Sequence, residues 1–234
     1  GFRTPTLSEL YATDIAKKND RLTIGNLDLK PEKNNYFSLS AEYVHERFSV
    51  SVNAFYNNIR DMIDYNTIAT GDKAMEQYGH KEVRQRDNIA EAKVHGINVS
   101  ANAYLGAGFN LSGGYTHLNT QDVELEQPID KSIKNAYNIN AQWAHSWKIY
   151  RLNINLNGRI NSKRFSKSYG YAPEYQLWDL NTRHSFNLKS VIIEPGCGME
   201  NLFDYMDDRP YNSNYATLTP GRSFYISLSL KFKS

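Results

Sequence analysis

The sequence predicts an all-β fold, a transmembrane antiparallel β-barrel, and three observations lead to that prediction. The last stretch, residues 221–232, alternates apolar and polar side chains, so a strand would carry its apolar groups on one face. Eight earlier segments repeat this alternation. The connections between consecutive segments are alternately short and long, as in outer-membrane barrels with short periplasmic turns and longer external loops.

The final segment shows the alternation in its simplest form. Its apolar row consists of Phe224, Ile226, Leu228, Leu230 and Phe232. Aromatic residues at both ends of such a row are typical of a strand that meets two membrane interfaces. A half-buried strand of a soluble β-sandwich would show the same alternation, so this segment alone leaves both folds open.

Nine strands are expected along the chain, each with a second face rich in polar residues. Their expected positions are residues 37–43, 48–57, 97–105, 109–116, 137–143, 152–160, 178–186, 193–203 and 224–232. A face rich in Asn and Ser suits a water-filled or plugged lumen better than the interior of a sandwich. Pro195 and Gly196 predict a bulge or an edge-like irregularity in the eighth strand.

Composition excludes several other classes of protein. The 234 residues are 40% hydrophobic, yet they include 17 Tyr and 10 Phe. No apolar run approaches the roughly 20 residues that a membrane-spanning helix needs. A net charge of +2 gives no reason to expect nucleic acid as a partner. The single Cys197 excludes an internal disulfide and lacks the Cys/His spacing of a zinc site.

The alternation of connection lengths assigns a side of the membrane to each loop. The expected external loops are residues 4–32, 61–90, 118–133, 162–175 and 204–221. Aromatic residues are expected to form one girdle near the short turns and another near the long loops. The first comprises Phe109, Trp147, Tyr150 and Phe186, and the second comprises Tyr56, Tyr115, Tyr137, Trp178 and Phe224.

Nine strands do not close a bacterial single-chain barrel, because such barrels use even numbers of strands. The missing strands are therefore expected upstream. The opening residues, GFRTPTLSELY, also lack the basic start and apolar core of a secretion signal. The chain is accordingly expected to be a fragment of a longer protein.

Four motifs then give the chain a family resemblance. They are GFRTPTLSELY at residues 1–11, GNLDLKPE at 25–32, NLFDY at 201–205 and PGR at 220–222. In order and spacing they resemble the GFRAPTxxELY, GNPxLKPE, NLFDxxY and PGR motifs of TonB-dependent outer-membrane receptors. Leu27 stands where the family usually has Pro. The resemblance covers the whole chain.

The resemblance implies a 22-stranded barrel of the bacterial outer membrane, filled by an N-terminal plug that this chain lacks. The chain would supply the last nine strands, and TonB would engage the missing N-terminal region. Outer-membrane lipid and a small-molecule chelate are the other expected partners. A ferric siderophore is the first expected ligand. Cobalamin, haem and oligosaccharide stay open as alternatives, as does a passive porin or adhesin.

The loop at 61–90 offers the first candidate ligand-binding residues, namely Tyr78, His80, Arg84 and Arg86. The two arginines could attract an anionic ferric chelate through charge-assisted hydrogen bonds. Acidic residues lie among them in the sequence, so an ordinary mixed-charge exposed loop is the competing interpretation.

Two further loops combine basic and aromatic residues in the way that a surface for a planar anionic chelate would. The candidates are Arg164, Tyr169 and Tyr171 in one loop, and Arg209, Tyr211 and Tyr215 in the last. The competing interpretation is that barrel rims are generally rich in Tyr. Arg159 and Arg183 are expected to face the lumen, whereas Arg3 and Glu32 are expected to brace the motif loops.

Catalysis is not expected. An enzyme would need a nucleophile or an activated water beside a positioned base, and no Ser, His and Asp arrangement is indicated. His117 and Asp122 are close in sequence but stand alone. No catalytic residue, metal site or resident cofactor is therefore predicted.

Overall fold

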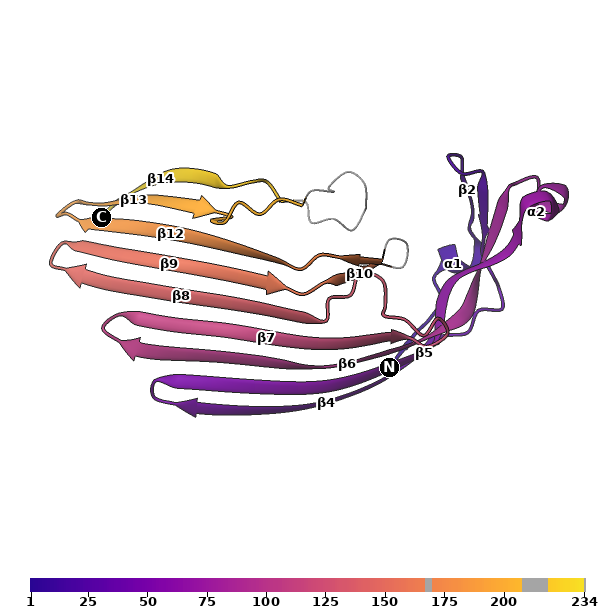
Figure 1. The fold of residues 1–234 in the computed structure, drawn as a ribbon, viewed down its shortest axis with the longest axis horizontal. Coiled ribbons are helices and arrows are strands. Elements are labelled where there is room, and N and C mark those ends of the chain that lie inside the picture. The colour runs from indigo at the N-terminus through magenta and orange to yellow at the C-terminus, as the bar shows by residue number, and fades with distance from the viewer. Residues whose placement is uncertain (167–169, 208–218, 234) are drawn as a thin grey trace. The chain divides into compact units, whose positions relative to one another are not determined.

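The computed structural model describes residues 1–166, 170–207 and 219–233, and its main feature is a series of nine long strands (Figure 1). Each strand is hydrogen-bonded to the next one along the chain. They are β4 (Glu32–His45), β5 (Phe48–Thr70), β6 (Glu82–Gly106), β7 (Phe109–Asp122), β8 (Asn135–Trp147), β9 (Tyr150–Asn161), β12 (Tyr175–Asn187), β13 (Val191–Glu200) and β14 (Ser223–Phe232). The nine strands expected from the sequence are confirmed.

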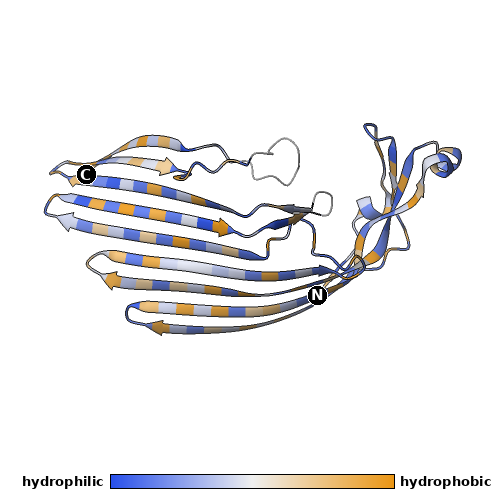
Figure 2. Ribbon diagram, in the orientation of Figure 1, coloured by the Kyte–Doolittle hydropathy of each residue, from blue (hydrophilic) through white to orange (hydrophobic). Residues whose placement is uncertain are grey.

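Strand register sorts the side chains into two faces, because directly opposed residues of an antiparallel pair point to the same side. Leu156 pairs with Ala141 on one neighbour and with Leu180 on the other. Asn155, the next residue along β9, pairs with Asn181. Figure 2 shows this alternation along the strands. Apolar residues therefore adjoin apolar residues, and amides adjoin amides.

The polar face is held together by side-chain hydrogen bonds. Asn140 donates to the Oδ1 atoms of Asn155 and Asn157, at 2.6 Å each. Lys231 and Glu194 form an ion pair of 2.7 Å on the same face. Arg183 lines a concavity of this face. Arg159 lies on the same face as the Asn residues of β9, because it is separated from them by an even number of positions. These placements agree with the expectation of a wet lumen.

The apolar face is exposed. Phe224, Ile226 and Phe232 of β14 are 69%, 87% and 82% exposed, respectively. Buried apolar side chains are few in the described part of the chain: Leu29, Ile63, Ala74, Val83, Ala92 and Ala172. A soluble sandwich would bury such a face against a second sheet. The competing sandwich fold is therefore not observed, and the apolar face requires an apolar surrounding.

Pro195 interrupts the pairing of β13 without shifting it. Opposite β12, Arg183 pairs with Gly196, and the ladder resumes with Phe186 and Ile193 in the same register. On its other side Pro195 pairs with Leu228. Because proline has no N–H to donate, the ladder weakens locally while no extra residue is inserted. The predicted irregularity is present, but the predicted bulge is wrong.

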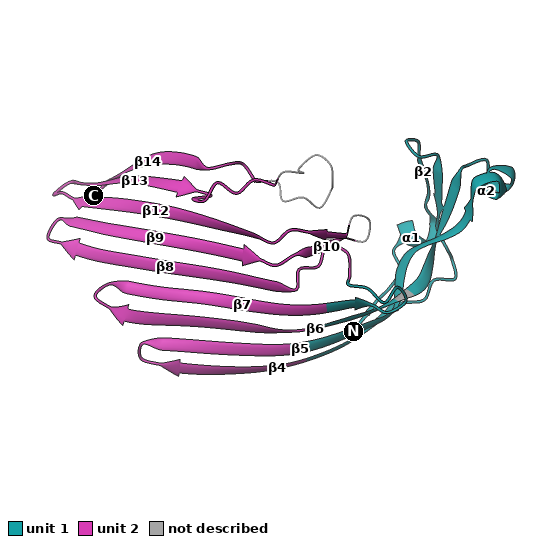
Figure 3. Ribbon diagram, viewed as in Figure 1, with its two compact units in different colours: residues 1–37, 55–95, 120–128 teal, residues 38–54, 96–119, 129–234 magenta. Residues whose placement is uncertain are grey.

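By internal contacts the chain divides into two compact units (Figure 3). Unit 1 comprises residues 1–37, 55–95 and 120–128. Besides parts of the long strands it contains β1 (Phe2–Arg3), α1 (Leu7–Tyr11), β2 (Thr13–Ala16), β3 (Arg21–Ile24) and α2 (Gly71–Tyr78). Strand β3 pairs with β2 and, in parallel, with β6. The segments 4–32 and 61–90 thus contain regular structure.

Unit 2 comprises residues 38–54, 96–119 and 129–234. It adds the short hairpin β10 (Arg164–Ser166) and β11 (Gly170–Ala172), which lies within the segment expected to be the loop 162–175. Gly108 closes the turn between β6 and β7 with a φ of +87°, a conformation that favours glycine. Across the described residues, no helix is long and apolar enough to cross a membrane.

A pair of neighbouring substitutions tests the two faces. Ile154→Arg in the intact gene product should destabilise the barrel by about 2–4 kcal/mol, the cost of Arg at mid-bilayer on a lipid-facing position. Asn155→Arg, on the polar face, should cost much less. Denaturant unfolding of the protein inserted in lipid vesicles measures both. Equal effects of the two substitutions would contradict the assignment of faces.

Candidate functional site

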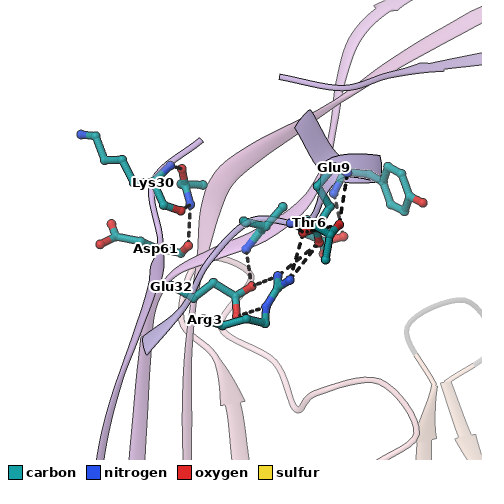
Figure 4. Close-up of polar contacts among 10 residues, drawn as sticks. Arg3, Thr6, Glu9, Lys30, Glu32 and Asp61 are labelled. Carbon is teal, nitrogen blue, oxygen red and sulfur yellow. Dashed lines mark hydrogen bonds and ion pairs between the residues drawn. The ribbon is translucent and has the colours of Figure 1, made fainter. Parts of the chain in front are cut away.

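The first two motifs meet at a single arginine (Figure 4). Strand β1 pairs with the start of β4 and sets Arg3 opposite Glu32. Arg3 Nε donates to Glu32 Oε2 at 2.8 Å, and Arg3 Nη1 donates to Glu9 Oε2 at 2.9 Å. One guanidinium therefore bridges two carboxylates that lie 23 positions apart in the sequence. The prediction that Arg3 and Glu32 brace the motif loops is confirmed.

Glu9 also takes part in capping the N-terminus of α1. Thr6 is the N-cap, and the Glu9 N–H donates to Thr6 Oγ1 at 3.3 Å. In return the Thr6 N–H donates to Glu9 Oε2 at 2.8 Å, which completes a capping box. The motif residues Thr6 and Glu9 thus start the helix, while the same carboxylate binds Arg3.

The cluster holds its two carboxylates in the ionised form. The hydrogen bond from Arg3 lowers the pKa of Glu9 from 4.5 to about 2. The same donor lowers the pKa of Glu32, and the two carboxylates raise the pKa of Arg3. Both acidic side chains are 14% exposed, so water screens the pairing only in part.

Asn88 ties the second motif to strands β5 and β6. The Lys30 N–H donates to Asn88 Oδ1 at 2.7 Å, and Asn88 Nδ2 donates to the carbonyl oxygens of Lys30 and Asp61 at 2.9 and 2.6 Å. The Ile63 N–H donates to Glu32 Oε1 at 2.9 Å. Asn88 was not a candidate from the sequence, because nothing in the residues around a single Asn indicates that it makes three hydrogen bonds to distant segments.

The four candidates of segment 61–90 all lie in unit 1. Tyr78 ends α2 and is half-buried. His80 Nδ1 lies 2.9 Å from Asp20 Oδ1, and this contact lowers the pKa of Asp20. Arg84 Nε donates to Glu82 Oε1 at 2.6 Å. The Nδ1 atom of His80 is therefore engaged by a carboxylate.

Arg86 lies on an aromatic ring. Its guanidinium carbon is 3.6 Å from the centroid of Tyr65, and Nη2 donates to the Tyr65 hydroxyl. A cation held on a ring face keeps several N–H donors available to a ligand. Tyr65 is 42% exposed, so the pair is accessible to solvent.

The parallel pairing of β3 with β6 adds a third arginine to this surface. Arg21 pairs with Glu82, and Thr23 pairs with Arg84. Arg21, Arg84 and Arg86 therefore share one face of the sheet with two carboxylates, Glu82 and Asp14, the latter paired with Thr23. Arg21 Nε is buried without a hydrogen-bond partner in the part of unit 1 that the structure describes. Asp14, Arg21, Glu82, Arg84 and Arg86, with Tyr65, are termed the arginine face below.

The hairpin β10–β11 places its two candidates on opposite sides. Arg164 pairs with Ala172, whereas Tyr171 pairs with Phe165, whose ring lies 5.3 Å away. Tyr171 is 57% exposed. Arg164 and Tyr171 thus do not form one basic and aromatic surface. The candidates Tyr169, Arg209, Tyr211 and Tyr215 lie outside the described residues.

No group of three or more His, Cys, Asp or Glu that could hold a metal ion occurs in residues 1–166, 170–207 and 219–233.

Comparison with known proteins decides the family. The model for the family "TonB dependent receptor-like, beta-barrel" matches residues 1–202. The chain belongs to this family of TonB-dependent receptors. The resemblance that the four motifs suggested is thereby confirmed, and the sheet described above is part of a receptor barrel.

Relatives and solved structures agree. Over 162 residues the receptor chain is 28% identical to "Probable TonB-dependent siderophore receptor PiuA" of Acinetobacter baumannii, covering 62% of this chain and 21% of that protein. It is also similar to the ferric preacinetobactin receptor BauA of A. baumannii, with a TM-score of 0.64, 18% identity, and coverage of 86% of this chain and 30% of that one. For the copper transporter OprC the TM-score is 0.70 at 14% identity, covering 99% and 36%. The receptor chain thus spans about a fifth of PiuA and about a third of these structures.

The Arg3 cluster predicts a defined acid response. Because the pKa of Glu9 is about 2 in the folded protein and 4.5 otherwise, its stabilisation is present above pH 4.5 and is lost as pH falls toward 2. The protection factors of the amide hydrogens of residues 6–11, which are exchange rates corrected for the intrinsic rate at each pH, should fall across this window. Glu9→Gln keeps the capping box but removes the charge, so its protection factors should be lower at pH 6 and should change little below pH 4.5. A wild-type response identical to that of Glu9→Gln would contradict the prediction.

Proposed function

We propose that the receptor chain forms the last nine strands of a 22-stranded barrel in the bacterial outer membrane and serves TonB-driven uptake of a ferric siderophore. An N-terminal plug and the segment that TonB engages would belong to a part of the protein outside this chain. The long connections 4–32, 61–90, 118–133, 162–175 and 204–221 would face the outside of the cell.

The main support for a membrane location is that the apolar face and the polar face each extend without interruption over neighbouring strands. Leu152, Ile154 and Leu156 are half-buried by their neighbours on the same face rather than enclosed by a second sheet. An apolar face of this kind is stable in hydrocarbon, and the backbone groups of each strand are hydrogen-bonded to its neighbours. The Asn-rich face would then enclose the plug.

The arginine face supports an anionic chelate as the ligand. Three guanidinium groups and the two carboxylates of Asp14 and Glu82 leave this surface with a net positive charge. Charge-assisted hydrogen bonds to carboxylate or catecholate oxygens are the strong kind. Known relatives point the same way, since BauA is a ferric preacinetobactin receptor and PfeA of Pseudomonas aeruginosa has been solved with enterobactin.

An enzymatic role is not proposed. The family is one of receptors, and the shifted pKa values of Arg3, Glu9 and Glu32 arise mainly from the hydrogen bonds that these three groups make with one another. Such a closed cluster holds loops together and leaves no carboxylate free to act as a general base.

Growth of a deletion strain tests the ligand class. The strain is supplied with ferric siderophores, haem, cobalamin or oligosaccharides as sole source of the nutrient, with and without the restored gene. Gene-dependent growth on a ferric siderophore that also requires TonB would support the proposal. Gene-dependent growth on another ligand would replace it, and growth that is independent of TonB would favour a passive porin.

The arginine face gives a specific prediction. Arg84→Gln with Arg86→Gln should weaken siderophore binding by roughly a hundredfold or more, since each of the two lost charged hydrogen bonds contributes about 1.5–3 kcal/mol. Lys17→Gln with Lys18→Gln removes the same charge from exposed positions of unit 1 and serves as the matched control. Binding to the intact receptor is measured by tryptophan fluorescence. An equal loss of binding affinity in both double variants would contradict the prediction, because net charge alone would then explain the effect.

A further inference from the structure

The short-turn end of unit 2 carries an aromatic row on the apolar face. Trp147 pairs with Tyr150, and Tyr150 pairs with Phe186. The rings of Trp147 and Tyr150 stack at 5.5 Å, and those of Tyr150 and Phe186 lie 5.0 Å apart. Trp147 and Phe186 are 44% and 38% exposed, so the row presents open ring surface.

Two histidines form the next row of the same face. His145 and His184 both pair with Leu152, from opposite sides. His184 Nδ1 lies 2.7 Å from the Tyr150 hydroxyl, and the His145 ring lies 4.4 Å from the Trp147 ring. Aromatic girdles consist mainly of Trp and Tyr, so the two histidines are an additional feature of this surface. These two add hydrogen-bonding groups one row farther from the turns than the aromatic row.

Three lysines lie at this end of the sheet. The turn of β8–β9 contains Lys148, and the turn of β12–β13 contains Lys189. The two turns are joined, because the Asn187 N–H donates to the Ile149 carbonyl at 2.7 Å. Lys233 adds a third ammonium group, with Nζ 2.7 Å from the Leu188 carbonyl oxygen.

These charges have no acidic partner among the residues that the structure describes. Residues 143–152, 184–193 and 228–233 contain no Asp or Glu. Neither Lys148 nor Lys189 makes an ion pair with the described residues. By contrast, Lys231 on the polar face is neutralised by Glu194. The positive charge is therefore concentrated at the turns and is free to meet an anion.

We infer that these two turns and the adjoining aromatic and histidine rows bind an anionic phospholipid in the leaflet at the short-turn side, with its phosphate at the turns. The ammonium groups of Lys148 and Lys189 neutralise the phosphate, and the aromatic row contacts the glycerol and upper acyl chains. Basic residues beside an aromatic belt are the complement of an anionic headgroup. The inference rests on the proposed outer-membrane location.

Lipid retention tests this inference. The intact receptor is inserted in vesicles of phosphatidylcholine containing phosphatidylglycerol, extracted in mild detergent, and analysed by native mass spectrometry. We expect the wild type to retain phosphatidylglycerol in preference to phosphatidylcholine. Lys148→Gln with Lys189→Gln should lower this retention by roughly tenfold, as expected for two basic groups near an anionic lipid. Lys17→Gln with Lys18→Gln should leave it unchanged.

Several outcomes would overturn the inference. Wild-type receptor that inserts but shows no preference for phosphatidylglycerol contradicts it and leaves the proposed function intact. Equal loss in both double variants, or a second receptor copy in place of lipid at these turns, contradicts it as well. Receptor that fails to insert in vesicles contradicts the proposed membrane location itself. His145→Phe with His184→Phe keeps the ring area, so a several-fold loss of the preference in this variant would support the imidazole contacts.

Discussion

The pairing of like residues across each ladder is the constraint on which the rest of this structure depends. In lipid every backbone group of a spanning strand must be hydrogen-bonded, so each strand has to pair on both sides along its length. Pairing fixes the register, and register fixes which side chains are neighbours. Leu156 can lie between Ala141 and Leu180 only while Asn155 lies beside Asn181. A slip of one residue in a strand would turn all of its apolar side chains to the polar face.

The first two motifs of the chain serve a related need in unit 1. Long connections between strands contain many backbone groups that the sheet does not pair. The Arg3 guanidinium joins Glu9 of one motif to Glu32 of the other, and Asn88 joins Lys30 to the carbonyl of Asp61. Segments distant in sequence thereby acquire fixed positions. A binding surface composed of connections needs such fixed points, because it has little core to support it.

Charge is distributed differently in the two units. In unit 1 the arginines are partly compensated, as Arg84 is by Glu82, and they share a face with an aromatic ring. At the short turns of unit 2, Lys148 and Lys189 make no ion pair within the described part of the chain, and they lie next to aromatic rows. The first arrangement suits a specific, oriented anion with several acceptor atoms. The second suits a fluid layer of many similar anions, where neutralisation matters more than geometry.

The sequence by itself determined the nine strands, the two faces and the family, because a period of two and short motifs are local properties that need no knowledge of neighbours. It also indicated that Arg3 and Glu32 are structural. Only the tertiary structure decided that Pro195 keeps its register, that Arg164 and Tyr171 lie on opposite faces, and that Arg21 joins Arg84. Each of these depends on which strand lies beside which, and in the case of β3 and β6 on a parallel pairing between segments some 60 residues apart. Pairings of that range leave no periodic trace in the sequence.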